Sequence, residues 1–126
     1  MDPRNKCEWL LKNSTGDSII VWKNFDFPDY EIVPNDSTVV VYGAGVASYD
    51  ETPDMFHWIL DAIVIEDSLK IFSQNDVMLK IWLQSQRNDP GRQFFNEKYW
   101  QKREWGEGRY MYHEWTFELL PEDILP

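Results

Sequence analysis

The sequence predicts a mainly β fold: a small antiparallel β-sandwich or open barrel of about seven strands, with one short helix near residues 54–61. Aromatic residues make up 16% of the 126-residue chain, and large rings favour the half-buried surface of a sheet. Short apolar runs alternate with turn residues along the chain, as in small all-β domains. Only one stretch repeats apolar residues at helical spacing.

The apolar runs give the expected strands. Residues 8–13 and 17–23 flank a turn in which Gly16 tolerates a positive φ, so we expect these two runs to form a β-hairpin. The run 37–42 is the clearest strand, because its β-branched residues are stiff and favour extended backbone. The full set of expected strands is 8–13, 17–23, 37–42, 62–65, 69–72, 77–83 and 109–119.

The remaining segments are expected to be loops, apart from the helix. Pro28 and Pro34 cannot donate to a central ladder, so 25–34 should be an edge segment or a long loop. Residues 43–53 form a loop, after which Thr52 as N-cap and Pro53 at the first helical position begin the helix. Polar residues dominate 84–108, with turns at 88–91 and 106–108.

Two strands show the alternation that one buried face produces. In the last strand His113 and Trp115 share the more apolar face, whereas Tyr110, Tyr112, Glu114 and Glu118 lie on the other. In the strand 77–83 the residues Val77, Leu79, Ile81 and Leu83 alternate with Met78, Lys80 and Trp82.

The chain has the size of one domain, 1–126, with residues 1–7 expected to be a flexible N-terminal segment. Its net charge is −10, which argues against nucleic acid as a partner, because affinity for phosphate backbones depends on clustered Lys and Arg. An acidic face can meet a basic partner, or can serve solubility alone. No apolar run is long enough for an integral membrane segment, and the residues after Met1 lack the apolar stretch of a signal peptide.

Motifs for catalysis and metal binding are weak. His57 and His113 are far apart, and neither has a second ligand at a metal-binding spacing. Lys6 could lower the pKa of the single cysteine, Cys7. The glycine pair at 43–45 lacks the third glycine of a phosphate loop and precedes several acids. We therefore expect no catalytic residues, no metal and no cofactor.

One stretch, 82–115, combines aromatic rings with basic side chains. Exposed Trp and Tyr rings beside polar donors suit a glycan or a peptide, although many of these rings must also fill the core of so small a domain. The candidate ligand-binding residues are Trp82, Arg92, Tyr99, Trp100, Arg103, Trp105 and Tyr110.

Three segments carry a resemblance to a known group. They are Asn13-Ser-Thr-Gly-Asp-Ser-Ile-Ile-Val-Trp22, then Val33-Pro34-Asn-Asp-Ser-Thr38, and the closing Tyr112-His-Glu-Trp-Thr-Phe-Glu-Leu-Leu-Pro-Glu-Asp-Ile124. Together they resemble small, uncharacterised bacterial lipoproteins, and the segment from Phe95 to Trp100 is similar to the one before their final strand. The resemblance implies a β-rich cell-envelope domain with no known activity, tethered through an acylated cysteine.

The chain departs from that group at Cys7, which follows Arg4-Asn5-Lys6 rather than the small, apolar residues of a lipoprotein signal. A lipid tether would then require a signal removed upstream of Met1. With such a signal the protein would belong to the cell envelope or be secreted. If Met1 is the native start, a cytoplasmic location is expected instead.

Three functions remain open at this stage. The leading hypothesis is a non-enzymatic extracytoplasmic domain that binds a protein or glycan through its aromatic C-terminal half. The alternative is an acidic immunity or inhibitor protein that masks a basic toxin. A hydrolase that uses paired carboxylates is the third, and it requires two acids held at a defined separation across a cleft.

Overall fold

The computed structural model describes residues 4–23, 30–48, 56 and 68–125. The helix expected at 54–61 and the strand expected at 62–65 therefore lie outside the described residues, apart from Phe56. Within the described part of the chain, no helix is long and apolar enough to cross a membrane.

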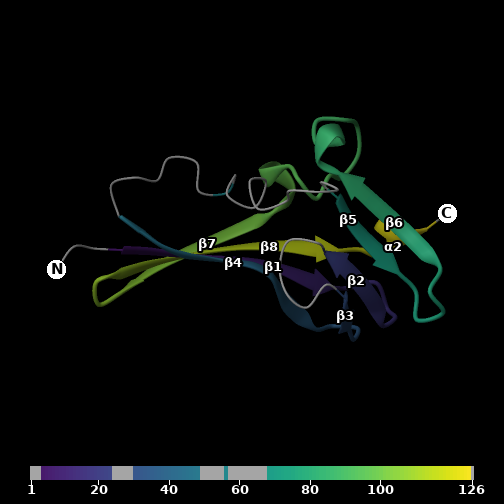
Figure 1. Ribbon diagram of the computed structural model, residues 1–126, viewed down its shortest axis with the longest axis horizontal. Coiled ribbons are helices and arrows are strands. Elements are labelled where there is room, and N and C mark those ends of the chain that lie inside the picture. Colours follow the sequence, from purple (N-terminus) through teal and green to yellow (C-terminus); the bar gives the residue numbers. More distant parts are fainter. Residues whose placement is uncertain (1–3, 24–29, 49–55, 57–67, 126) are drawn as a thin grey trace.

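The described residues form eight strands in two four-stranded sheets, which confirms the prediction of a small β-sandwich. The long sheet has the order β4-β1-β8-β7 and the short sheet has the order β3-β2-β5-β6. In Figure 1 one end of the long sheet, with the start of β1 and the β7–β8 turn, projects beyond the short sheet. The strands are β1 (Arg4–Asn13), β2 (Ile19–Lys23), β3 (Tyr30–Val33), β4 (Thr38–Ser48), β5 (Ser68–Phe72), β6 (Met78–Leu83), β7 (Gln101–Glu107) and β8 (Tyr110–Leu119).

Three short helices complete the described elements. They are the 3₁₀ turns η2 (Gln84–Gln86) and η3 (Glu97–Tyr99) and the α-helix α2 (Pro121–Ile124). The sequence predicted none of them, because a single turn is too short to show helical periodicity.

The expected hairpin of 8–13 and 17–23 is wrong, because β1 and β2 belong to different sheets. The Asn13 side chain redirects the chain between them: its Oδ1 accepts from the Thr15 backbone N–H at 3.0 Å, and its Nδ2 donates to the Asp17 carbonyl at 2.7 Å. Such a local side-chain turn competes with hairpin pairing. Gly16 has φ +98°, the conformation for which a glycine was expected.

The centre of the long sheet is also not antiparallel. β1 lies between β4, with which it pairs antiparallel, and β8, with which it pairs in parallel from Arg4 to Asn13. This pairing begins inside the segment 1–7 that was expected to be flexible, and Asn5 and Cys7 are buried there. The expectation of a flexible N-terminal segment is thus wrong from Arg4 onward.

Two further strands extend beyond the sequence prediction. β4 does not end at residue 42 but continues to Ser48, with Ala44 and Ala47 paired to β1. The glycine pair at 43–45 therefore belongs to a strand rather than to a loop. β7 lies within the stretch that was expected to be a polar loop. The sequence did not predict this strand because its residues are mostly exposed and it has no apolar side; it is held by its pairing with β8.

The core lies between the two sheets and is rich in rings. On β8 the expected alternation holds: His113, Trp115, Phe117 and Leu119 are buried. On β6 the buried face is that of Trp82, whereas Val77 and Ile81 are exposed. The largest buried side chains are Trp9, Trp82, Trp115, Phe56, Phe94, Phe95 and Phe117.

Candidate functional site

Two of the candidate ligand-binding residues, Trp82 and Trp100, belong to the core. They are 2% and 7% exposed. The Trp82 indole N–H donates to the Arg92 carbonyl at 2.9 Å, and that of Trp100 donates to the Phe94 carbonyl at 2.6 Å. Both rings thus have their polar atom satisfied internally, as buried tryptophans usually do, and neither is part of a surface that a ligand can reach.

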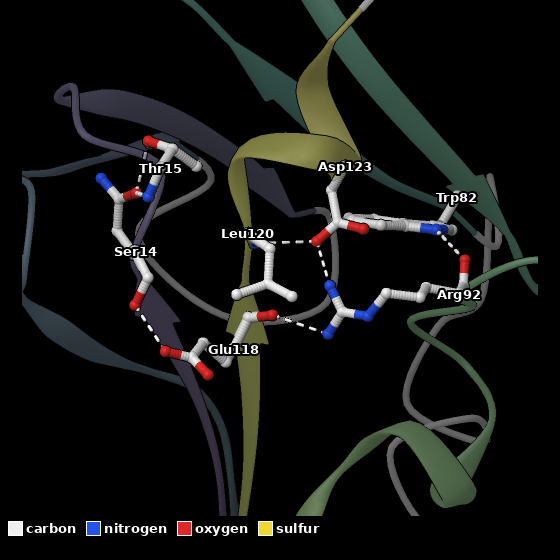
Figure 2. Close-up of polar contacts among 8 residues, drawn as sticks. Ser14, Thr15, Trp82, Arg92, Glu118, Leu120 and Asp123 are labelled. Carbon is white, nitrogen blue, oxygen red and sulfur yellow. Dashed lines mark hydrogen bonds and ion pairs between the residues drawn. The ribbon is translucent and has the colours of Figure 1, made fainter.

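A third candidate, Arg92, holds the C-terminal segment against the aromatic core. Its guanidinium pairs with the Asp123 carboxylate and donates to the Glu118 carbonyl at 2.8 Å (Figure 2). The same Asp123 carboxylate accepts from the Leu120 backbone N–H at 2.8 Å, which satisfies an otherwise unpaired donor at the start of α2. Both terminal nitrogens of the guanidinium thus have partners within the fold, which makes Arg92 a structural residue.

Tyr99 occupies an intermediate position. It is half-buried, packs against the core and closes η3, with the Lys98 ammonium 5.1 Å from the centre of its ring. Its ring is therefore separate from the rings on the outer side of the long sheet.

The remaining three candidates, Arg103, Trp105 and Tyr110, do come together on the outer side of the long sheet. Trp105 lies opposite Tyr112 across the β7–β8 pair, and their rings stack with centroids 5.2 Å apart and an interplanar angle of 10°. Directly opposite residues of paired strands lie on one face, so this stack follows from the register. Tyr110 lies 6.2 Å from Tyr112 on the same side.

Two cations flank these rings. The Arg103 guanidinium carbon is 4.4 Å from the centre of the Trp105 ring, and the Lys6 ammonium is 4.2 Å from that of Tyr110. Lys6 comes from β1, where its parallel register places it beside Tyr112. We call this group the aromatic face: Lys6, Arg103, Trp105, Tyr110 and Tyr112.

The opposite side of the same strands carries a polar cluster, in which Asn5 and His113 are buried and Glu104 is exposed. His113 Nε2 lies 2.6 Å from Asn5 Oδ1. His113 Nδ1 has no hydrogen-bond partner and lies 3.8 Å from a Glu104 carboxylate oxygen. Burial lowers the pKa of His113, which the Glu104 charge partly opposes. A hydrogen bond from Lys102 lowers the pKa of Glu104.

Cys7 does not have the character of a reactive thiol. Burial raises its pKa to about 11, whereas the sequence suggested that Lys6 would lower it. Adjacent residues of a strand point to opposite faces, and Lys6 is directed at the tyrosines of the aromatic face rather than at the sulfur. A thiol that stays protonated is a poor nucleophile.

The other motifs also acquire structural roles. Glu118 accepts a 2.7 Å hydrogen bond from the Ser14 hydroxyl, and Glu114 lies 3.7 Å from Arg103 (Figure 2 for the first pair). His57 lies outside the described residues. Among the described residues, no group of three His, Cys, Asp or Glu side chains could hold a metal ion.

The segments that carry the lipoprotein resemblance meet in space. The Ser14 hydroxyl contacts Glu118, and the Asp123 carboxylate accepts from the Leu120 backbone N–H nearby (Figure 2). Asn13 Nδ2 also donates to the Val33 carbonyl at 3.0 Å. Residues of these segments thus fasten loops and strand ends to one another.

Sequence reasoning missed a second surface, on the outer side of the short sheet. Tyr30 and Ile32 on β3 are 61% and 63% exposed. Next to them lies a groove of about 560 Å³, which we call the sheet groove; among the described residues it is lined by Ile20, Tyr30, Ile32, Phe72 and Asp76. The run Ile-Ile-Val-Trp of β2 is apolar on both sides, so its pattern could not reveal an exposed apolar face.

The comparisons with known proteins returned nothing: no family model, no curated protein and no solved structure matches this chain.

Proposed function

We propose that this chain is a non-enzymatic binding domain whose partner is a protein and whose contact surface is the aromatic face. The observation that carries the proposal is the stacked pair of Trp105 and Tyr112, half-exposed on the outer side of the long sheet between two cations. Trp, Tyr and Arg are the residues in which binding energy concentrates at protein interfaces. A ladder of paired strands holds them in place, so little side-chain order is lost on binding.

The arrangement of the rings favours a protein over a glycan. A sugar binds by laying its C–H groups on an open ring face, but Trp105 is already stacked against Tyr112 and covered by Arg103. Tyr110 is likewise covered by Lys6. What remains accessible is ring edges, phenol hydroxyls and cations, which suit the carboxylates and carbonyls of a protein surface.

The surroundings of the acids and of the thiol support the non-enzymatic part of the proposal. The carboxylates of Glu114 and Glu118 lie along one flat strand and pair with Arg103 and Ser14, rather than facing each other across a cleft. The Cys7 thiol is buried and stays protonated near neutral pH, because its pKa is about 11. The alternative of an acidic inhibitor differs in one respect: its complex with a basic toxin would dissociate at high salt.

An extracytoplasmic location is part of the proposal and is supported only by the resemblance. Fractionation of the native host, with a tag at the C-terminus, tests it. Recovery with the envelope or the medium supports the proposal, and recovery with the cytosol contradicts it.

Binding is tested by affinity capture from a host extract, followed by titration of the purified captured protein. The double variant Trp105→Ala/Tyr110→Ala should weaken the complex at least tenfold, since interface anchors are worth about 2 kcal/mol or more each. Tyr30→Ala, which removes an exposed ring from the other sheet, should leave the affinity for the captured protein unchanged. A glycan array probes the competing class: saturable glycan binding that the double variant abolishes would overturn the choice of a protein partner.

A further inference from the structure

We infer that the sheet groove is a second docking surface, independent of the aromatic face, and that it binds a protein segment presenting apolar side chains together with a Lys or Arg. The proposal rests on two rows of mostly apolar side chains on the outer side of the short sheet and on the carboxylate of Asp76, which lines the groove.

Two rows of side chains cross all four strands on the outer side of the short sheet. In the first row Ile20 lies opposite Ile32 on one side and opposite Phe72 on the other, and Phe72 lies opposite Met78. Ile32 is 63% exposed and Met78 is 52% exposed. A row of this kind is a continuous apolar strip rather than a set of scattered residues.

The second row runs parallel to the first. Trp22 lies between Tyr30 and Lys70, and Lys70 lies opposite Ile81. The Tyr30 and Trp22 ring centroids are 6.3 Å apart, and the Lys70 ammonium is 4.4 Å from the centre of the Trp22 ring. The one cation within the two rows is thus held against a ring. Contiguous exposed apolar surface of this kind marks interaction sites in soluble proteins.

The width of this surface favours a protein segment over a small apolar molecule. A small molecule would fill the groove beside Ile20 and Phe72 and would leave Met78 and Ile81 exposed beyond it. A segment laid across the strands covers both rows and removes more apolar area from water.

Charge determines which protein segment fits. Asp76 lines the groove, and within the described part of the chain its carboxylate makes neither an ion pair nor a hydrogen bond. The whole chain carries a net charge of −10, so a second copy would be repelled, whereas a basic segment would be attracted. A Lys or Arg of the segment would lie against Asp76 while its apolar neighbours contact Ile32 and Phe72.

The probe is a short synthetic peptide that alternates valine with lysine, titrated into the isotope-labelled protein and followed by backbone amide NMR. Two matched peptides replace lysine by glutamate or valine by serine. We expect saturable shifts on β2, β3, β5 and β6 with the valine–lysine peptide alone, since the segment covers both rows. Ile32→Ser should weaken that binding by about tenfold, from the lost apolar contact, and Asp76→Asn by about two- to fivefold, from the lost ion pair.

Several results would overturn the inference. If the serine–lysine peptide binds as tightly as the valine–lysine peptide, the binding depends on charge alone and not on the apolar rows. If the valine–glutamate peptide binds equally well, Asp76 does not select a basic segment. Sedimentation that shows self-association, abolished by Ile32→Ser, would assign the surface to a second copy. Trp105→Ala should leave the peptide titration unchanged, because Trp105 lies on the other sheet. A failure of the sheet-groove proposal therefore leaves the aromatic-face proposal intact, and a failure of the aromatic-face proposal leaves the sheet-groove proposal intact.

Discussion

The Ser14 hydroxyl donates a 2.7 Å hydrogen bond to the Glu118 carboxylate across a sequence separation of 104 residues. This contact joins the turn after β1 to the end of β8, beside the backbone bond from the Ser14 N–H to the Leu119 carbonyl at 2.9 Å. Both contacts lie next to the ion pair of Arg92 and Asp123 (Figure 2). The end of the long sheet is therefore held by polar contacts as well as by the core.

We expect Ser14→Ala to lower the free energy of unfolding by about 0.5–1.5 kcal/mol, the usual net value of one hydrogen bond. Urea unfolding of Ser14→Ala, Glu118→Ala and the double variant forms a cycle that isolates the pair, because alanine at 118 removes the acceptor. Additive effects of the two substitutions would contradict the contact.

Removing Arg92 should cost far more. Arg92→Ala leaves the Asp123 carboxylate, whose side chain is 4% exposed, without its cation. The expected loss is roughly 2–4 kcal/mol, because an unpaired buried charge is expensive. Arg92→Lys keeps the charge but not the fork that also reaches Glu118, so its loss should be intermediate. A loss within about 0.5 kcal/mol for Arg92→Ala, as at an ordinary surface site, would contradict this role.

The two tryptophans on either side of the long sheet should differ sharply. Trp100→Ala removes a ring that is 7% exposed and contacts Phe94 and Phe117, so a loss of about 3–5 kcal/mol is expected. Trp105→Ala removes a half-exposed cross-strand pair, worth roughly 0.5–1.5 kcal/mol. Chemical denaturation measures both values, and similar losses at the two sites would argue against the separation of core from aromatic face.

Acid should destabilise the protein through His113. Burial holds the pKa of His113 below its ordinary value of 6.5, with Glu104 opposing and Lys102 adding to the shift. The unfolded chain therefore takes up a proton at a higher pH than the folded one. The stability that His113 contributes is full above pH 6.5 and is lost as the pH falls from there toward the lowered folded pKa.

The measurement is the urea midpoint between pH 7.5 and 5.5, in the native chain and in His113→Gln. The variant should show a flatter dependence over this window. The carboxylate of Glu104 has a lowered pKa, so the stability it contributes is full above its ordinary value of 4.5 and changes only below that pH, outside the window. An identical slope in both proteins would rule out His113 as the titrating group.

Cys7 should resist alkylation in the folded state. With a pKa of about 11, only about one thiol in a thousand is ionised at pH 8, and burial slows access further. Iodoacetamide labelling followed by mass spectrometry should be complete in urea and very slow without it. Labelling of the native protein at the rate of a free thiol would contradict this environment.

The fold class was predictable because several strands have unequal faces. On β8 the alternation of apolar Trp115 and Phe117 with polar Glu114 and Thr116 indicated the buried side directly. β2 gave no such indication, since both of its sides are apolar. On β6 the aliphatic alternation did not indicate the buried side: Trp82 is buried and donates to the Arg92 carbonyl, whereas the neighbouring Ile81 is exposed.

Pairing between distant strands was the part that local pattern could not supply. The hairpin predicted around Gly16 matched the local sequence, yet Asn13 turns the chain into the other sheet. The aromatic face was found only in part for the same reason: Arg103, Trp105 and Tyr110 are close in sequence, whereas Lys6 reaches them through the parallel pairing of β1 with β8. The sheet groove depends on three strands that no sequence pattern links.

The parallel pairing of β1 with β8 also governs when the domain can form. β1 is made early, but one of its two edges has no neighbour until β8 has been synthesised. Contacts of such high sequence separation are closed late and slowly, because loop entropy must be overcome before they form. On the ribosome the long sheet therefore stays incomplete until β8, about 100 residues after β1, has emerged, and the nascent β1 edge needs protection from other strands until then.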